Sequence, residues 1–171
     1  MSTQPLDEEV ATHGEKIGDV VDGRYRITGL LGRGGMGTVF EAEHVTIRRP
    51  VALKMLHPFL GSLPEIARRF EREAYAAGKI VHPNCVVVTD FGQLADGRLY
   101  LAMELLDGIP LGTLLDEQPR LGVERSLRIA RHVLRGLGHA HQSGIVHRDV
   151  KPDNVILVEQ GGDPDFAKVL D

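Results

Sequence analysis

A polar segment from His147 to Asn154, with the sequence HRDVKPDN, holds the densest set of chemically useful side chains in the chain. A carboxylate at Asp149 can orient a hydroxyl group or accept its proton. Lys151 can neutralise charge that develops on a phosphoryl group during transfer, and Asn154 can offer a neutral oxygen to Mg²⁺. These residue types rarely meet at this spacing by chance, so the segment predicts a phosphoryl-transfer site rather than a polar surface loop.

A glycine-rich turn lies far upstream, where Gly32, Gly34 and Gly37 form the pattern G-x-G-x-x-G. Glycine makes up 20 of the 171 residues, so this spacing alone is a weak signal. Strands are expected on both sides of the turn, whereas a dinucleotide fingerprint would open a helix. Bare backbone N–H groups in such a turn can approach phosphate oxygens closely. The alternative is a flexible hairpin loop without a ligand.

Two charged residues follow the glycine turn. Lys54 ends the run VALK on an expected strand, where its ammonium group could meet phosphate oxygens as a point charge. Glu73 lies on the helix expected next, closer to the apolar stripe of that helix than Glu71. We therefore expect Glu73 to turn toward the sheet and pair with Lys54. Alone, each of the two would be read as an ordinary solvated side chain.

The composition is that of a globular protein, with 42% hydrophobic and 26% charged residues. The net charge of −4 leaves no basic excess for a phosphate backbone, so nucleic acid is not an expected partner. No apolar run reaches the roughly 18 residues of a membrane span, and no signal peptide is evident, so we expect a cytoplasmic protein without a membrane segment. The single cysteine, Cys85, excludes an intrachain disulfide and is expected to be buried.

The pattern of apolar residues predicts an α+β fold with two lobes. Residues 1–22 are polar and are expected to form a flexible leader. An antiparallel five-stranded sheet with one helix should follow. The expected strands cover 25–31, 38–42, 51–56, 85–91 and 98–105, and the helix runs from 64 to about 81. Later segments predict helices over 111–115 and 123–142, and strands over 155–158 and 166–170.

One face of the expected helix over 123–142 is apolar. Its residues are Leu127, Ala130, Val133, Leu134, Leu137 and His141. We expect much of this face to stay exposed, because the sequence ends soon afterwards.

The glycine turn, VALK, the helix glutamate and HRD…N occur in the order found in the protein-kinase catalytic domain, which this chain resembles from about Tyr25 to Asp171. Lys151, two residues after Asp149, is similar to the serine/threonine class. The run from Leu31 to Gly37 is similar to bacterial members of the eukaryotic-like kinases. The resemblance implies a kinase-like bilobal fold, with an ATP-binding N-lobe over 23–105 and a partial C-lobe over 106–171.

The resemblance also implies a site for ATP and Mg²⁺. The residues that would cover the phosphates are Gly32, Arg33, Gly34, Gly35, Met36 and Gly37. The residues that would enclose the adenine are Leu31, Val39, Ala52 and Ile156, with Met103 as gatekeeper and the backbone of Glu104 and Leu106 at the adenine edge. Lys54, held by Glu73, would bind the α- and β-phosphates. Asn154 and Asp171 would hold Mg²⁺, and Asp149 would act with Lys151 in catalysis.

By this resemblance, the parent enzyme transfers the γ-phosphoryl group of ATP to Ser or Thr hydroxyls of protein substrates. The sequence ends at Asp171, where the family continues with Phe-Gly and the peptide-binding helices, so the 171-residue chain alone is expected to transfer little. Two alternatives stay open. The chain could be a nucleotide-binding or regulatory remnant without transfer activity, or an interaction protein that binds no nucleotide.

Overall fold

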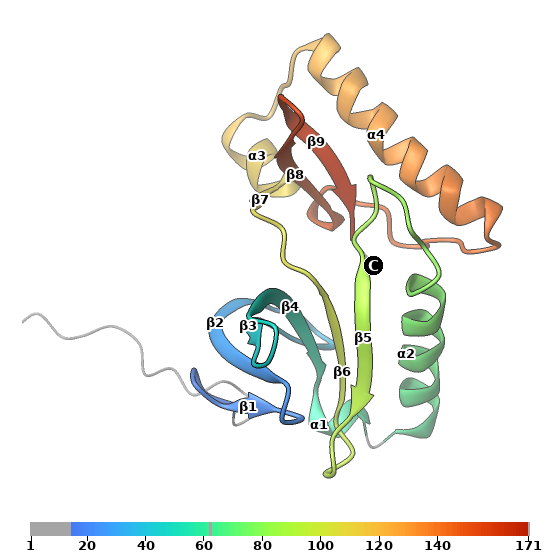
Figure 1. The fold of residues 1–171 in the computed structure, drawn as a ribbon. Helices are drawn as coiled ribbons and strands as arrows, with labels where there is room; N and C mark the ends of the chain where they lie inside the picture. The colour runs from blue at the N-terminus through green and yellow to red at the C-terminus, as the bar shows by residue number, and fades with distance from the viewer. Residues whose placement is uncertain (1–14, 62, 171) are drawn as a thin grey trace, which may run out of the picture.

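The computed structural model describes residues 15–61 and 63–170 (Figure 1). Residues 1–14 of the predicted leader, and Asp171 as a predicted Mg²⁺ ligand, lie outside this range. The described residues form two antiparallel sheets, and helices pack against each of them. The α+β class and the two-lobed arrangement are confirmed.

The larger sheet has six strands in the order β1-β2-β3-β4-β6-β5. Their bounds are Val20–Val21 (β1), Tyr25–Arg33 (β2), Gly37–His44 (β3), Arg49–Leu56 (β4), Val88–Gln93 (β5) and Leu99–Glu104 (β6). The five predicted strands are present, but the strand count is one too low. The missed strand, β1, lies near the end of the segment 1–22, which was predicted to be a flexible leader. Because β1 pairs with β2, the prediction of a flexible leader is wrong for Val20 and Val21.

Apolar core clusters lie on both faces of the larger sheet, because successive strand residues point to opposite sides. On β4, Leu53 and Met55 belong to one core cluster with Tyr100. The neighbouring Ala52 and Leu56 belong to a second cluster, which faces the helix α2. We call the elements β1–β6, α1 (Pro58–Gly61) and α2 (Pro64–Ala77) the first lobe.

Helix α2 begins at Pro64, whose fixed backbone suits the first helical turn. It buries Phe70 and Ala74 against the sheet. The sequence predicted a helix to about residue 81, yet α2 ends at Ala77, where Gly78 N–H donates to the Ala74 carbonyl. Val81 is consequently 75% exposed and no longer part of the helix face.

Strand β5 begins at Val88, not at residue 85 as predicted, because the preceding residues pair with the second sheet. Cys85 forms a parallel bridge with Val169. Val86 N–H donates to the Val169 carbonyl, and Val169 N–H donates to the Asn84 carbonyl, both at 2.9 Å. Cys85 is buried, as expected. Residues 84–86 therefore connect the two sheets.

The smaller sheet has the order β7-β8-β9 and forms, with the helices α3 and α4, what we call the second lobe. The bounds are Gly108–Pro110 (β7), Leu111–Glu117 (α3), Val123–Gln142 (α4), Val155–Gln160 (β8) and Asp163–Val169 (β9). A single 3-10 turn, Pro152–Asn154, precedes β8. The long helix α4 lies along β9 (Figure 1). Its predicted bounds are confirmed, whereas β7 was not predicted.

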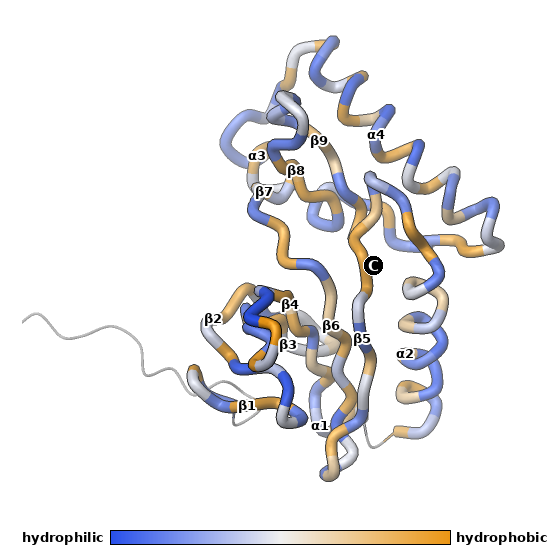
Figure 2. The backbone as a smooth tube through the Cα atoms, viewed as in Figure 1, coloured by the Kyte–Doolittle hydropathy of each residue, from blue (hydrophilic) through white to orange (hydrophobic). Residues whose placement is uncertain are grey.

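The face that α4 buries differs from the predicted apolar face. Its buried residues are Ile129, His132, Gly136 and Ala140. Leu127 and Leu134 are 66% and 68% exposed, and hydrophobic positions recur along the whole helix in Figure 2. The predicted exposed apolar surface is therefore present, and Ala130 and His141 of the predicted face are exposed as well.

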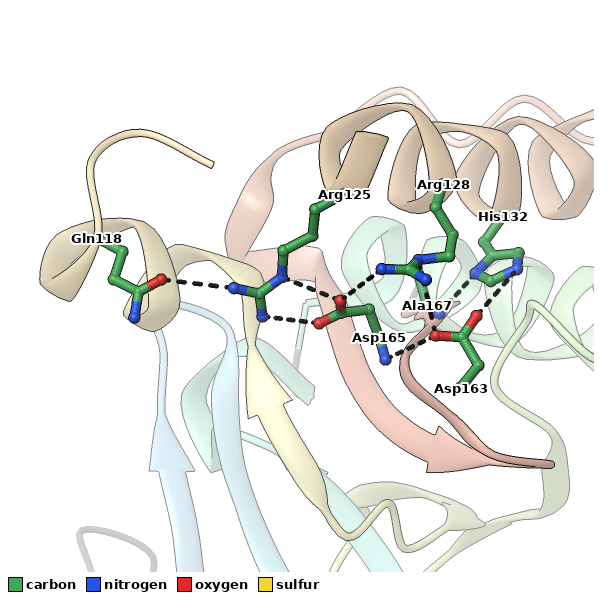
Figure 3. Close-up of polar contacts among 7 residues, drawn as sticks. All are labelled: Gln118, Arg125, Arg128, His132, Asp163, Asp165 and Ala167. Atoms are coloured by element: carbon green, nitrogen blue, oxygen red, sulfur yellow. Dashed lines mark hydrogen bonds and ion pairs between the residues drawn. The ribbon is translucent and has the colours of Figure 1, made fainter. Parts of the chain in front are cut away.

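Charged side chains explain the orientation of α4 (Figure 3). Arg125 donates to both carboxylate oxygens of the buried Asp165 on β9, at 2.9 and 2.7 Å. Arg128 donates to the same carboxylate at 3.4 Å, and His132 Nδ1 accepts from Ala167 N–H at 3.3 Å. Further along, a Cβ on Gly136 would lie 2.7 Å from the Asn84 carbonyl oxygen. This face can approach the sheet only because it carries paired polar groups and a glycine.

Among the helices of the described residues, none is long and apolar enough to cross a membrane.

Candidate active site

The loop between α4 and β8 brings three of the predicted catalytic side chains into direct contact. Lys151 Nζ lies 2.9 Å from Asp149 Oδ2, and Asn154 Nδ2 donates to the same oxygen at 3.0 Å. Asn154 Nδ2 also donates to the Asp149 carbonyl at 2.8 Å. The amide nitrogen of Asn154 is thus bonded within the loop, which leaves Oδ1 as its ligand atom. The prediction of one cluster from residues 149–154 agrees with this geometry.

The side chain of His147 connects this loop to Leu170, a role that the sequence analysis did not assign to it. Its Nδ1 accepts from Asp149 N–H at 3.2 Å, and its Nε2 lies 2.6 Å from the Leu170 carbonyl. Because a carbonyl only accepts, Nε2 carries the proton. Arg148, which lies between His147 and Asp149, has a φ of 65°, in the left-handed region that a non-glycine residue adopts only under constraint. The signal available in the sequence was the position of His147 directly before Arg148 and Asp149.

The contacts of Asp149 set its charge. Hydrogen bonds from Lys151 and then Asn154 hold the pKa of the Asp149 carboxyl below its usual value. The same contact raises the pKa of Lys151. Asp149 is therefore ionised at neutral pH and is a weak base. Such a carboxylate is suited to orienting a hydroxyl group and to accepting its proton late in a reaction.

The glycine turn joins β2 to β3, as predicted. Gly34 N–H donates to the Gly37 carbonyl at 2.8 Å, which closes the turn. A Cβ on Gly37 would lie 2.1 Å from the Met55 carbonyl oxygen, so the base of the turn is packed tightly on β4. At Gly32 and Gly35 a Cβ would meet nothing within 4 Å, so bare backbone faces open space there. A ligand could therefore approach the backbone closely at these two positions.

Lys54 lies in the middle of the larger sheet, near the turn. It is opposite Val39 on β3 and opposite Leu101 on β6. The predicted adenine-binding residues lie partly around it. Those that share one apolar cluster are Val39, Ala52, Met103 and Leu106. Leu31 is half exposed on β2, and Ile156 lies on β8 opposite Pro110 and Lys168, so neither belongs to that cluster.

Glu73 does not make its predicted pair with Lys54. Its carboxylate accepts from Arg69 Nε at 2.8 Å, one turn earlier in α2, and its side chain is 57% exposed. A pair four residues apart on one helix forms at little entropic cost, and it holds Glu73 on the outer flank of α2. In the described residues, the glutamate and the lysine are therefore not brought together.

Glu104 has a buried partner that the sequence did not indicate. Both oxygens of its carboxylate accept from Lys168 Nζ, at 2.7 and 2.8 Å, and Oε1 also accepts from Val87 N–H at 2.8 Å. The backbone N–H of Glu104 donates to the Val87 carbonyl at 2.9 Å. Only the carbonyl of Glu104 is consequently left for an adenine edge. Lys168 is 64 residues away, and nothing in the local sequence marks it.

Leu170 completes the link between the strand β9 and the catalytic loop. Its N–H donates to the Asn154 carbonyl at 2.9 Å, and its carbonyl accepts from His147. The residue next to Asp171 in the sequence is thereby held beside Asn154, the other predicted Mg²⁺ ligand.

Comparisons with known proteins identify the family of the chain. The family model described as the protein kinase domain matches residues 25–171. The serine/threonine-protein kinase pkn3 of Myxococcus xanthus is 42% identical over 157 residues, which cover 92% of this chain and 29% of that protein. PknE of Mycobacterium tuberculosis is 42% identical over 149 residues, or 87% of this chain and 25% of that protein.

Among solved structures, the kinase domain of Mycobacterium tuberculosis PknI superposes with a TM-score of 0.77 at 33% identity. The match covers 92% of this chain and 62% of that one, so the chain spans less than two thirds of a solved kinase domain. It likewise spans less than a third of the curated relatives. Sequence motifs, fold and the family model agree: the chain belongs to the protein kinase family.

Proposed function

We propose that this chain binds Mg-ATP and supplies the nucleotide site and catalytic loop of a kinase that phosphorylates Ser and Thr hydroxyls of proteins. The observation that carries the proposal is the contact among Asp149, Lys151 and Asn154, in which an ionised carboxylate, a cation and an amide oxygen meet on one loop. Transfer of a phosphoryl group to a hydroxyl group needs a group that orients the hydroxyl, a cation that neutralises charge and an oxygen ligand for the metal ion, all at one place.

The nucleotide would lie between the two lobes, with its phosphates under the glycine turn. Open backbone at Gly32 and Gly35 supports this placement, as does the position of Lys54 on the adjacent strand. The apolar cluster that includes Ala52 and Met103 would contact the adenine ring. The Glu104 carbonyl and the Leu106 backbone would bind its edge. Leu31 and Ile156 would have to approach the ring from outside that cluster.

The donor set also fits Mg²⁺, which prefers oxygen ligands. Asn154 offers Oδ1, because its nitrogen is bonded to Asp149. Asp171 would supply the second protein ligand, next to Leu170, which is bonded to Asn154. When bound, the metal ion neutralises charge on the phosphates.

In the proposed reaction, Asp149 accepts a hydrogen bond from the substrate hydroxyl and so directs its oxygen at the γ-phosphorus. A bond forms between that oxygen and the phosphorus while the bond from the phosphorus to the bridging oxygen of ADP breaks. The hydroxyl proton passes to Asp149, and Lys151 stabilises the negative charge on the transferred group.

Thermal unfolding with and without Mg-ATP tests the proposal. A ligand at about 100 times its Kd should stabilise the chain by about 2.7 kcal/mol. Lys54→Met should reduce this shift. Lys79→Met is a matched control, because Lys79 packs on the Tyr75 ring at the outer surface of α2. An unchanged Tm with Mg-ATP, or an equal shift in the wild type and Lys54→Met, would contradict the proposal.

The second candidate function is that of a nucleotide-binding remnant without transfer activity. The same preparation separates the two functions. Transfer of phosphate from ATP to a Ser/Thr peptide, abolished by Asp149→Ala, supports the kinase. Binding of Mg-ATP without detectable transfer supports the remnant.

A further inference from the structure

His57 sits where the end of β4 meets the glycine turn. The last pair of the β3–β4 ladder is Gly37 with Leu56, and His57 follows directly. Its N–H donates to the Met36 carbonyl at 3.0 Å. Its carbonyl accepts from Leu60 and Gly61 N–H, at 2.9 and 3.0 Å, where α1 begins. The backbone of His57 is therefore fixed on both sides.

The side chain of His57 reaches across the turn to its tip. Nε2 lies 3.0 Å from the Gly34 carbonyl oxygen. A carbonyl can only accept, so Nε2 is the donor. Gly34 N–H is already bonded to the Gly37 carbonyl. With the imidazole in place, both backbone groups of Gly34 are bonded, and the tip is attached to the strand that carries Lys54.

The rest of the turn has few contacts that could fix it. Among the residues that the structure describes, Gly37 at its base is packed against β4 and the Met36 carbonyl accepts from His57 N–H, whereas Gly32 and Gly35 face open space and Met36 is 45% exposed. A turn that must be ordered when a ligand binds costs affinity, and one that is already ordered does not. The bond from His57 orders the segment that would lie over the phosphates.

We infer that His57 is a positioning residue for nucleotide binding, which holds the tip of the glycine turn in place over the phosphate groups. The inference rests on the proposed binding of Mg-ATP. It also predicts which part of the ligand is affected. In the proposed binding mode the tip lies over the phosphates and not over the adenine. Loss of the hydrogen bond should therefore lower the affinity for ATP and leave the affinity for adenosine unchanged.

The test compares His57→Phe, which keeps a ring but has no donor, with His57→Gln, whose amide nitrogen can replace Nε2. Affinities for Mg-ATP and for adenosine are measured by calorimetry on the full chain. His57→Phe should lower the affinity for Mg-ATP about threefold to tenfold and the affinity for adenosine less than about twofold. His57→Gln should stay within about twofold of the wild type for both. His141→Leu, at an exposed position on α4, is the histidine control and should change neither.

Three results would overturn the inference while nucleotide binding stands: equal Mg-ATP affinity in the wild type and His57→Phe, equal weakening of adenosine and ATP, or no rescue by Gln. A wild-type chain that binds no Mg-ATP overturns the proposed function, and this inference falls with it. The imidazole ¹⁵N shifts of the wild type give a check that needs no variant. A proton on Nδ1 instead of Nε2 would contradict the bond to Gly34.

Discussion

The two lobes that carry the two halves of the site are stabilised differently. In the first lobe, core clusters cover both faces of the larger sheet, and Leu53 and Leu99 are fully buried. In the second lobe there is one smaller cluster, and α4 leaves Leu127 and Leu134 largely exposed. The glycine turn is thus supported by β4, a strand with both of its faces in apolar clusters. The catalytic loop relies more on hydrogen bonds and on the ion pairs between α4 and β9.

The same substitution placed in each core should show the largest difference between the lobes. Leu53→Ala should cost about 3–5 kcal/mol, because the residue is fully buried in the middle of the larger sheet. Leu157→Ala, in the smaller core on β8, should cost about 2–3 kcal/mol. Urea denaturation measures both. Leu134→Ala is the control and should stay within about 0.5 kcal/mol. Equal costs for Leu53 and Leu157 would remove the contrast between the lobes.

Loss of the carboxylate that holds α4 should be the next largest effect. Asp165→Ala leaves Arg125 and Arg128 without their shared acceptor and should destabilise the chain by about 2 kcal/mol, because the two arginines are partly exposed. Glu43→Ala removes an exposed pair with Arg48 in the first lobe and should cost less than about 1 kcal/mol. Chemical denaturation of the two variants compares them directly. A small loss for Asp165→Ala would mean that apolar packing, and not this ion pair, holds the second lobe.

Within the first lobe, two glycines of the same turn should respond unequally. A methyl group on Gly37 would collide with the Met55 carbonyl, so Gly37→Ala should cost about 1–3 kcal/mol. Gly35→Ala meets open space and should change stability by less than about 0.5 kcal/mol. The Tm of each unliganded variant measures the difference. Similar losses at both positions would show that the base of the turn is not packed on β4 as described.

The smallest effect is an electrostatic one in the catalytic loop. Lys151 is the main cause of the lowered pKa of Asp149, so Lys151→Met should raise that pKa toward its usual value. Asn154→Ala should raise it less. Because the pKa of Asp149 is lowered, the carboxylate stays ionised at neutral pH and should not change its charge between pH 5 and 8. An NMR titration of the Asp149 carboxyl carbon follows both variants. A larger rise with Asn154→Ala would reverse the assigned order of causes.

Sequence reasoning succeeded where the interacting residues are close in the chain. Asp149, Lys151 and Asn154 lie within six residues, so one loop conformation brings them together. The strands of the larger sheet were predicted because they alternate regularly between tight turns. β1 and β7 escaped prediction because two or three residues show no alternation.

Contacts that depend on tertiary packing could not be predicted in this way. The pair of Lys168 with Glu104 joins two strands from different sheets, and only the packing of the lobes brings them together. Glu73 was expected to reach across to Lys54, but a local partner, Arg69, was available. On α4, the apolar face that was expected to stay exposed does so, but the buried face could not be found from apolar periodicity, because it includes His132 and Gly136.

The pairing of residues 84–86 with Val169 has a mechanical consequence. The lobes are connected by the chain between β6 and β7 and, separately, by these two backbone hydrogen bonds and the ion pair of Lys168 with Glu104. Moving one lobe away from the other would therefore have to break two backbone hydrogen bonds and an ion pair, all close to Cys85 in the fold.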